Sequence, residues 1–291
     1  MSLVDIVKNY LSPTQKRYFK RKYAIIKARV INQFYSYTPS QLEGELGKMG
    51  LVEGDTILVH SSFTAFNGFT GEARQIIDCI LNVVGASGNV IMMSMTYKGS
   101  SYDYLKMGEP FNVKKTISRM GMISESFRRR EGVLRSANPL HPILALGSRA
   151  EWLIADHDKI MHSCGKGSPF EKLLQLNTKV LFFDVSFLSL SFLHYLEDLY
   201  AECAPVKVYR DELLDSIIID TSGEERRVKT FVFSKEAIQS RNFPVVENEL
   251  KAKNLITTKK IGNTRLMLTD LQSIVDCAHT IVESGRHFYH V

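Results

Sequence analysis

Residues 55–96 read DTILVHSSFTAFNGFTGEARQIIDCILNVVGASGNVIMMSMT. The segment holds two short apolar runs, at 56–59 and within 88–96, each bounded by glycine and polar residues. Runs of this kind are typical of strands buried inside a sheet. Between them, residues 72–83 have the apolar spacing of a helix. A strand, a helix and a second strand in this order predict an α/β fold with parallel strands.

The same alternation continues along the chain. Further strands are expected at 142–147 (PILALG) and 178–186 (TKVLFFDVS), and a helix at 191–202 (SFLHYLEDLYAE). After residue 205, two β-rich runs flank a Ser222-Gly223 turn, and residues 259–269 (KKIGNTRLMLT) have the pattern of one more strand. We therefore predict a mainly parallel central sheet flanked by helices, with a C-terminal antiparallel β addition.

Charge is unevenly distributed. Residues 1–36 hold eight Lys and Arg and one acid, Asp5, which gives +7, whereas residues 37–291 hold 29 basic and 30 acidic residues, which gives −1. Residues 13–35 have the outline of a basic amphipathic helix. We interpret residues 1–36 as a helical extension and 37–291 as a single domain. The extension is expected to pack on the body or on another subunit, or to lie at an anionic membrane surface.

The remaining bulk properties exclude several classes of protein. The near-neutral body gives no reason to expect a nucleic-acid partner. No apolar stretch approaches the length of a membrane span, and the N-terminus does not have the pattern of a secretory signal. The four cysteines are widely spaced and form no C-x-x-C pair, which favours free thiols in a reducing compartment. We expect a cytoplasmic protein, peripheral to the inner face of the membrane if the extension binds there.

Three segments carry residues suited to chemistry. The first, His60-Ser61-Ser62-Phe63, follows the first predicted strand, at the edge where open α/β sheets bind ligands. The second is RSANPLHP at 135–142, where Arg135 is able to meet an anion and His141 to titrate near neutral pH. Each of these segments is equally well explained by turn chemistry or by surface residues.

The third segment is SFLHYLEDLY, which places His194 and Glu197 three residues apart on a predicted helix. Residues at this spacing share a face, so Glu197 is able to accept a hydrogen bond from one imidazole nitrogen. That bond fixes the tautomer and leaves the other nitrogen free to accept a proton. The pair suits the removal of a proton from an attacking amine, although a surface His–Glu pair has the same sequence pattern.

Taken together, the chain resembles the aminoglycoside 3-N-acetyltransferase family over roughly residues 38–285. The resemblance rests on ordered blocks: LGKMGLVEGDTILVHSSF, the glycine-containing helix start at 68–73, VVGASGNVIM, MGMISESFRRREGVLRS-x-NP, GKGSPFEKLLQL-x-x-KVLFF, LHYLE and KKIGNTRLMLTDLQSIVD. It implies direct acetyl transfer from acetyl-CoA to an amine and the α/β fold of the family. By matching position, His194 and Glu197 correspond to the family's catalytic H-x-x-E pair.

The resemblance also implies binding residues. Those expected on the acetyl-CoA side are His60, Ser61, Ser62, Phe63, Ser94, Arg135 and Ser136, and those expected on the acceptor side are Asn138, His141, Asp184 and Ser191. The chain departs from the family pattern on the acceptor side. Asn138 stands where the family has a histidine, the proline after the second strand is missing, and Leu190-Ser191 replaces a polar pair. A more apolar acceptor side suits a polycationic antibiotic poorly.

We therefore interpret the chain as an acetyl-CoA-dependent N-acetyltransferase. The expected acceptor is an amino sugar. A more specific form of this hypothesis is that the sugar is nucleotide-linked and used for the synthesis of a surface polysaccharide. Acetylation of an aminoglycoside antibiotic is the alternative within the class, and no metal is expected. Two alternatives lie outside the class. One is a metal-dependent hydrolase in which His194 and Glu197 join His141, His157 or His162 as ligands; the other is a non-catalytic CoA-binding protein.

Overall fold

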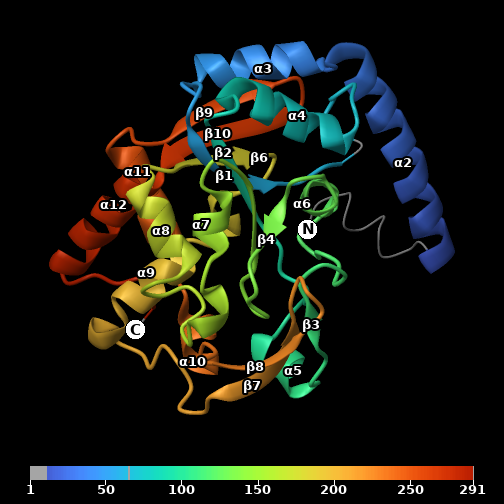
Figure 1. Ribbon diagram of the computed structural model, residues 1–291. Helices are drawn as coiled ribbons and strands as arrows, with labels where there is room; N and C mark the ends of the chain where they lie inside the picture. The colour runs from blue at the N-terminus through green and yellow to red at the C-terminus, as the bar shows by residue number, and fades with distance from the viewer. Residues whose placement is uncertain (1–11, 65, 291) are drawn as a thin grey trace.

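The computed structural model of the protein describes residues 12–64 and 66–290. Its centre is a seven-stranded sheet with the order β4-β5-β2-β1-β6-β10-β9 (Figure 1). The strands are β1 (Thr56–Ser61), β2 (Asn89–Met93), β4 (Leu134–Arg135), β5 (Ile143–Gly147), β6 (Lys179–Phe183), β9 (Thr257–Ile261) and β10 (Thr264–Asp270). β1 pairs in parallel with both β2 and β6, whereas the outer strands pair antiparallel.

The predicted α/β class is confirmed, and the parallel part of the sheet is its centre, β2-β1-β6. The single strand predicted at 259–269 is wrong, because this segment forms the β9–β10 hairpin. Ile261 pairs with Thr264, so the loop has two residues, Gly262 and Asn263. Gly262 has φ +54°, and a β-carbon at this position would overlap the Tyr35 carbonyl oxygen, so a side chain is excluded there.

Helices cover both faces of the sheet (Figure 1). Ile57 and Val59 of β1 pack with α3 (Pro39–Lys48), α4 (Ala73–Val84) and α6 (Met122–Arg128). Leu58 points to the opposite face, where it packs with α7 (Ala150–Ile154), α8 (Pro169–Gln175), α9 (Leu193–Leu199), α11 (Pro244–Ala252) and α12 (Leu271–Glu283). Successive side chains of a strand alternate between faces, so a continuously apolar strand such as β1 supplies both cores.

A second, smaller sheet has the order β3-β7-β8 and lies at the lower end of the view in Figure 1. It contains β3 (Phe111–Asn112), β7 (Leu214–Ile219) and β8 (Glu225–Thr230), with α5 (Ser101–Lys106) and α10 (Lys235–Ser240) nearby in the chain trace. β7 and β8 pair antiparallel around the Ser222-Gly223 turn. The antiparallel addition expected after residue 205 is therefore present.

The N-terminal helix is α2 (Pro13–Phe34), capped by Ser12 and Gln15. It stands at the right of Figure 1, and Ile31 is its one buried residue. Tyr23, Ile26 and Phe34 are 67%, 60% and 68% exposed. Among the described residues, no helix is both long enough and apolar enough to span a bilayer.

Candidate functional site

The predicted catalytic pair lies on α9, which follows β6 after a short 3-10 turn, η2 (Phe187–Ser189). This order brings the start of α9 to the carboxyl edge of the parallel strands, where α/β proteins bind ligands. His194 and Glu197 share one face of the helix, with 2.7 Å between Nδ1 and Oε2. The structure thus forms the pair that the sequence suggests, and its role in catalysis stays a prediction.

Glu197 is the centre of a network that reaches the C-terminal segment. Its carboxylate is fully buried, and it accepts two hydrogen bonds from Arg241, through Nε at 2.7 Å and Nη2 at 2.8 Å. The Tyr289 hydroxyl donates to Oε1 at 2.9 Å. With His194 on Oε2, each carboxylate oxygen receives two hydrogen bonds. Such saturation is what a buried carboxylate needs in order to remain ionised.

These contacts fix the protonation of the pair. Burial raises the pKa of Glu197, but the hydrogen bonds from His194 and Arg241 outweigh it and hold this pKa below its usual value. Burial also lowers the pKa of His194 below its usual 6.5, and the bond to Glu197 only partly opposes this. His194 is therefore neutral at pH 7. Because Nδ1 donates to an ionised Glu197, Nε2 is the nitrogen able to accept a proton.

His194 forms part of the wall of a cavity of about 790 Å³. The other side chains that line it include Met95, Tyr97, Tyr102, Asp103, His141, Arg210, Phe233, Lys235 and Arg241. The His194 ring is held against Phe233 and His141, with ring centroids 5.1 Å and 5.4 Å away. Its side chain is 20% exposed, so a ligand in this cavity is able to reach it.

A narrower cavity of about 220 Å³ lies at the ends of β1 and β2. Its lining includes His60 and Ser61, together with Met92, Met93 and Ser189. His60 stacks on Phe182, and burial lowers the pKa of His60 to about 4, so the ring is neutral. Its Nε2 is buried and has no hydrogen-bond partner among the described residues. A buried donor or acceptor without a partner is rare, and this one fits a polar ligand.

The other residues of the strand-end loops have different surroundings. Ser62 donates its backbone N–H to the Phe183 carbonyl, and Phe63 is half-buried against the core. Ser94 is fully buried, and its Oγ has no partner among the described side chains and backbone groups. The wall of the 220 Å³ cavity does not include Ser62, Phe63 or Ser94.

Arg135 and Ser136 are used inside the protein. The Arg135 guanidinium donates to the carbonyls of Val113, Thr116 and Ser94, and burial lowers its pKa to about 10. Ser136 Oγ bonds the His157 ring and accepts the Ile143 N–H. These side chains hold the loops around the cavities, and Arg135 Nε has no hydrogen-bond partner among the described residues. The predicted contact of Arg135 and Ser136 with acetyl-CoA stays a prediction.

Asn138 is also a structural residue. Its Oδ1 accepts the N–H groups of Leu140 and His141, and its Nδ2 donates to the His157 carbonyl. Asn138 thus shapes the turn that presents His141, and its predicted contact with the acceptor stays a prediction. His141 does line the 790 Å³ cavity. Its Nδ1 is 2.7 Å from Ser163 Oγ, and burial holds its pKa well below the usual 6.5.

Asp184 and Ser191 flank the turn between β6 and α9. Asp184 has φ +55° and donates its N–H to the Arg265 carbonyl, while burial raises its carboxyl pKa. Ser191 is buried, and its carbonyl accepts the His194 N–H at 3.1 Å. Neither side chain is among those that line the 790 Å³ cavity. Their predicted contact with the acceptor remains a prediction; their visible role is to shape the approach to α9.

Of the histidines of the hydrolase alternative, His141 lies beside His194, with ring centroids 5.4 Å apart, whereas His157 and His162 have other partners. His157 is buried between Ser136 and the Ser163 carbonyl, and His162 bonds Asp198 at 2.6 Å. Within residues 12–64 and 66–290, no three His, Cys, Asp or Glu side chains are grouped as metal ligands. The proposed ligand set of that alternative is therefore not formed.

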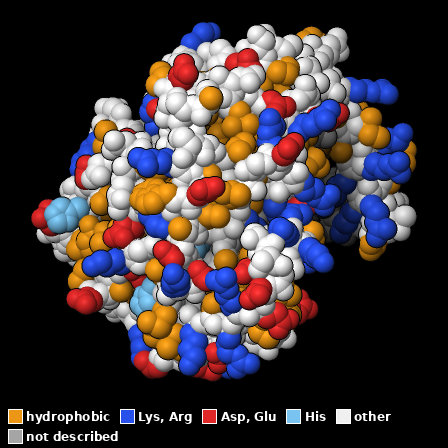
Figure 2. Space-filling model, viewed as in Figure 1, with side chains coloured by type: hydrophobic (Ala, Val, Ile, Leu, Met, Phe, Trp, Pro, Cys, Tyr) orange, Lys and Arg blue, Asp and Glu red, His pale blue; other side chains and the backbone are white. Residues whose placement is uncertain are grey.

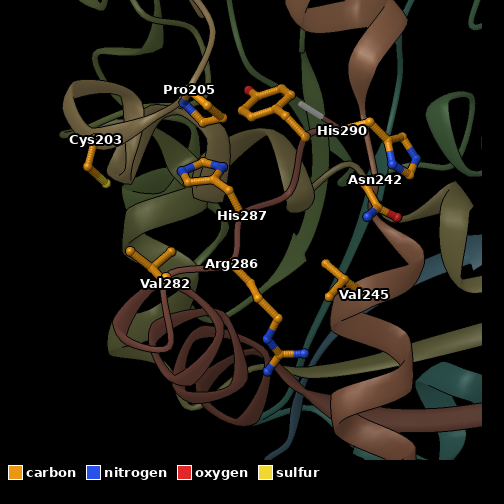
Figure 3. Close-up of a pocket in the computed structure, with 10 residues that line it drawn as sticks. Cys203, Pro205, Asn242, Val245, Val282, Arg286, His287 and His290 are labelled. Carbon is orange, nitrogen blue, oxygen red and sulfur yellow. The ribbon is translucent and has the colours of Figure 1, made fainter.

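Another cavity, of about 490 Å³, lies beside the C-terminal segment (Figure 3). Arg286, His287 and His290 extend from that segment, and Asn242 and Val245 face them from the start of α11. None of the residues predicted from the sequence to act in catalysis or binding lines it. The candidate site is therefore the 790 Å³ cavity, whose wall includes His194.

Two residues of the site have no counterpart in the sequence prediction. Arg241 and Tyr289 lie 44 and 92 residues from Glu197 in the chain. They meet it because the backbones around residues 241 and 289 pair as an antiparallel bridge, flanked by the Asn242 N–H bond to the Phe288 carbonyl. Neither segment has a local sequence pattern that indicates a functional site.

Comparisons with known proteins show what the chain is similar to. The chain is 28% identical over 174 residues to an aminoglycoside N(3)-acetyltransferase III of Acinetobacter baumannii, an alignment that covers 55% of this chain and 60% of that protein. It thus spans less than two thirds of that relative. It is 24% identical over 272 residues to the SPbeta prophage-derived aminoglycoside N(3')-acetyltransferase-like protein YokD of Bacillus subtilis (strain 168), covering 87% and 95% of the two chains.

Solved structures share the fold. One described as AAC-IIIb binary with CoASH has a TM-score of 0.73 at 24% identity, covering 88% of this chain and 99% of that one. The aminoglycoside acetyltransferase AAC(3)-Xa has a TM-score of 0.77 at 22% identity, covering 91% and 99%. A family model described as aminoglycoside 3-N-acetyltransferase matches residues 58–283, most of the chain. With its fold and its His194–Glu197 pair in place, this chain belongs to the aminoglycoside 3-N-acetyltransferase family.

Proposed function

We propose that this chain transfers an acetyl group from acetyl-CoA to a primary amine of an amino sugar, with His194 as general base. The observation that carries the proposal is the arrangement around His194: a neutral imidazole, oriented by the buried Glu197, at the wall of a 790 Å³ cavity. An amine that attacks an acyl carbon must lose a proton. A neutral imidazole with one free nitrogen is suited to accept it.

Acetyl-CoA supplies the acetyl group as a reactive thioester. The 220 Å³ cavity fits its narrow arm, because methionines line it and His60 Nε2 is an unused polar group within it. His60 and Ser61 are the proposed contacts, with Ser62, Phe63 and Ser94 around them. As the new C–N bond forms, His194 Nε2 takes the proton of the amine. The C–S bond breaks, and His194 returns that proton to the sulfur that leaves.

A second candidate is acetylation of an aminoglycoside antibiotic, because the relatives carry that name. The wall of the 790 Å³ cavity argues against it, since a polycation is best bound by acidic side chains and, among the described residues, Asp103 is the one carboxylate in this wall. We therefore favour an amino sugar with few positive charges.

The test is an acceptor screen that follows the release of CoA thiol from acetyl-CoA. We expect turnover with amino sugars to exceed that with gentamicin-like substrates. CoA should also raise the melting temperature, as a ligand selective for the folded state does. If gentamicin is acetylated with higher kcat/KM than every amino sugar, the antibiotic alternative holds. CoA binding without transfer to any amine would support a non-catalytic CoA-binding protein instead.

The exposed face of α2 suggests where the enzyme works. Figure 2 shows hydrophobic and basic side chains mixed at the right edge of the molecule, where α2 lies in Figure 1. Phe19, Tyr23, Ile26, Val30 and Phe34 follow one another at intervals of three or four residues and are 44–68% exposed. The helix holds seven Lys and Arg and no acid. A second copy would add like charge, so we propose an anionic membrane surface as its partner.

This proposal predicts binding to vesicles that contain phosphatidylserine at low salt, weakening as salt rises. Changing Phe19, Ile26 and Phe34 to Ser should abolish binding and leave acetylation of a soluble acceptor nearly intact. The matched control changes Met107, Ile117 and Leu255, which are exposed elsewhere, to Ser. Co-sedimentation measures both. If the full-length protein does not bind such vesicles, the helix is a subunit contact. The same conclusion follows if the α2 variant changes the oligomeric state instead.

A further inference from the structure

The charged residues in the wall of the His194 cavity are unequal in number. Three are cations, Arg210, Lys235 and Arg241, and one is an acid, Asp103. Arg241 is neutralised by its bonds to Glu197. Arg210 and Lys235 make no ion pair with any Asp or Glu in the described part of the chain. With Arg241 paired, Arg210 and Lys235 remain in this wall against one acid, Asp103, so the wall keeps a net charge of +1 beside the proposed base.

Arg210 is held in place by contacts other than an ion pair. Its guanidinium carbon lies 3.9 Å from the centroid of the Tyr102 ring, and its backbone N–H donates to the Val232 carbonyl at 3.0 Å. Its Nε is buried and has no hydrogen-bond partner in residues 12–64 and 66–290. Stacking on an aromatic ring orients a guanidinium while leaving its edge free for the paired hydrogen bonds that phosphate and carboxylate accept.

Aromatic rings line the same cavity, and one of them, Tyr102, lies directly against Arg210. Tyr97 and Tyr102 line the cavity, and the Tyr97 ring stacks on Tyr104, with centroids 4.8 Å apart and an angle of 17° between the rings. Aromatic faces beside a fixed guanidinium are a common way to bind a ring that carries an anionic group.

We infer that the acceptor carries a phosphate or another anionic group, bound by Arg210 and Lys235 while its amine meets His194. The acceptor class is thus an anionic amino sugar, such as a sugar phosphate or a nucleotide-linked sugar. The inference rests on the proposed acetyl transfer. It also predicts that a polycation should be a poor acceptor, since the wall beyond the His194–Glu197–Arg241 network has more cations than acids.

The test compares two acceptors with the same amine, glucosamine and glucosamine 6-phosphate. We expect kcat/KM to be about 10- to 100-fold higher for the phosphate, the range of one to two charge-assisted hydrogen bonds. Arg210→Gln and Lys235→Gln should each lower kcat/KM for glucosamine 6-phosphate more than kcat/KM for glucosamine, and so reduce this preference. Arg210→Lys should keep part of it. The control, Lys259→Gln, alters an exposed cation on the edge strand β9 and should preserve the full preference.

Acetyl-CoA also carries phosphates, so its own KM is measured in every variant. If Arg210→Gln raises the KM for acetyl-CoA and leaves the preference for glucosamine 6-phosphate intact, these cations serve acetyl-CoA and the inference is overturned. An equal kcat/KM for the two acceptors in the wild type overturns it too. Calorimetric titration with glucosamine 6-phosphate decides the matter without turnover. Binding lost in Arg210→Gln supports the inference even if no acetyl transfer occurs, in which case only the proposed function fails.

Discussion

Replacing His194 with alanine is expected to lower turnover by about 10²–10⁴-fold, the usual contribution of a positioned general base. Without the imidazole, the proton of the attacking amine must pass to water, and the new C–N bond reverts to reactants more often. Binding of acetyl-CoA should persist, because the proposed contacts of its arm are at His60 and Ser61. Steady-state kinetics and a CoA melting-temperature shift measure the two effects separately.

The protein contains a matched control for this substitution. His279 and Glu283 form a His–carboxylate pair on α12, with 3.0 Å between Nε2 and Oε1, and their side chains are 60% and 66% exposed. His279→Ala removes the same chemistry from a surface helix and should leave turnover unchanged. Glu197→Gln should cost less than His194→Ala, because the amide still accepts the Nδ1 proton but no longer stabilises the imidazolium. If His194→Ala keeps more than about a tenth of wild-type turnover, His141 becomes the candidate base.

Replacing Arg241 with methionine is expected to destabilise the protein by about 3 kcal/mol, the lower end for breaking a buried ion pair. Glu197 is fully buried and would lose two of its four hydrogen bonds, whereas Arg241 itself is 20% exposed. A carboxylate left in an apolar site without its cation carries an uncompensated desolvation cost. Urea unfolding of the two proteins measures the difference.

Two further variants separate charge from packing. The double variant Arg241→Met with Glu197→Gln should recover part of the lost stability, because no charge remains buried. Arg286→Met, which removes a half-exposed partner of Glu249 at 3.5 Å, should change stability by less than about 1 kcal/mol. The account of the network is contradicted if Arg241→Met is as mild as Arg286→Met. Arg241 also lowers the pKa of His194, so the pKa of His194 should rise in Arg241→Met.

Features of the fold and the site that depend on residues close together in the sequence are predictable, whereas those that depend on residues far apart in the sequence are not. β1 and β2 are predictable because an uninterrupted apolar run reports burial on both faces. The His194–Glu197 pair is predictable because residues three apart on a helix meet by geometry alone. The β9–β10 hairpin is missed because β9 is an exposed edge strand with the sequence TTKKI, which lacks the apolar pattern of a buried strand.

Residues whose partners are distant in sequence are the hardest to assign. Arg135, in a loop that resembles a binding segment, spends its donors on three backbone carbonyls from 19 to 41 residues away. Arg241 and Tyr289 converge on Glu197 only after the C-terminal segment has folded back against the residues around Arg241. Composition and periodicity report local burial, and neither reports which buried polar groups meet.

The central claim, that His194 is the base, is tested most directly by the pH dependence of kcat/KM with an acceptor whose amine stays neutral throughout the range. Burial lowers the pKa of His194 below 6.5, so the base form is complete at pH 7 and is lost as pH falls through that lowered pKa. The account predicts an acid limb with its midpoint below pH 6.5 in the wild type, and no such limb in His194→Ala. An acid limb that is unchanged in His194→Ala would contradict it.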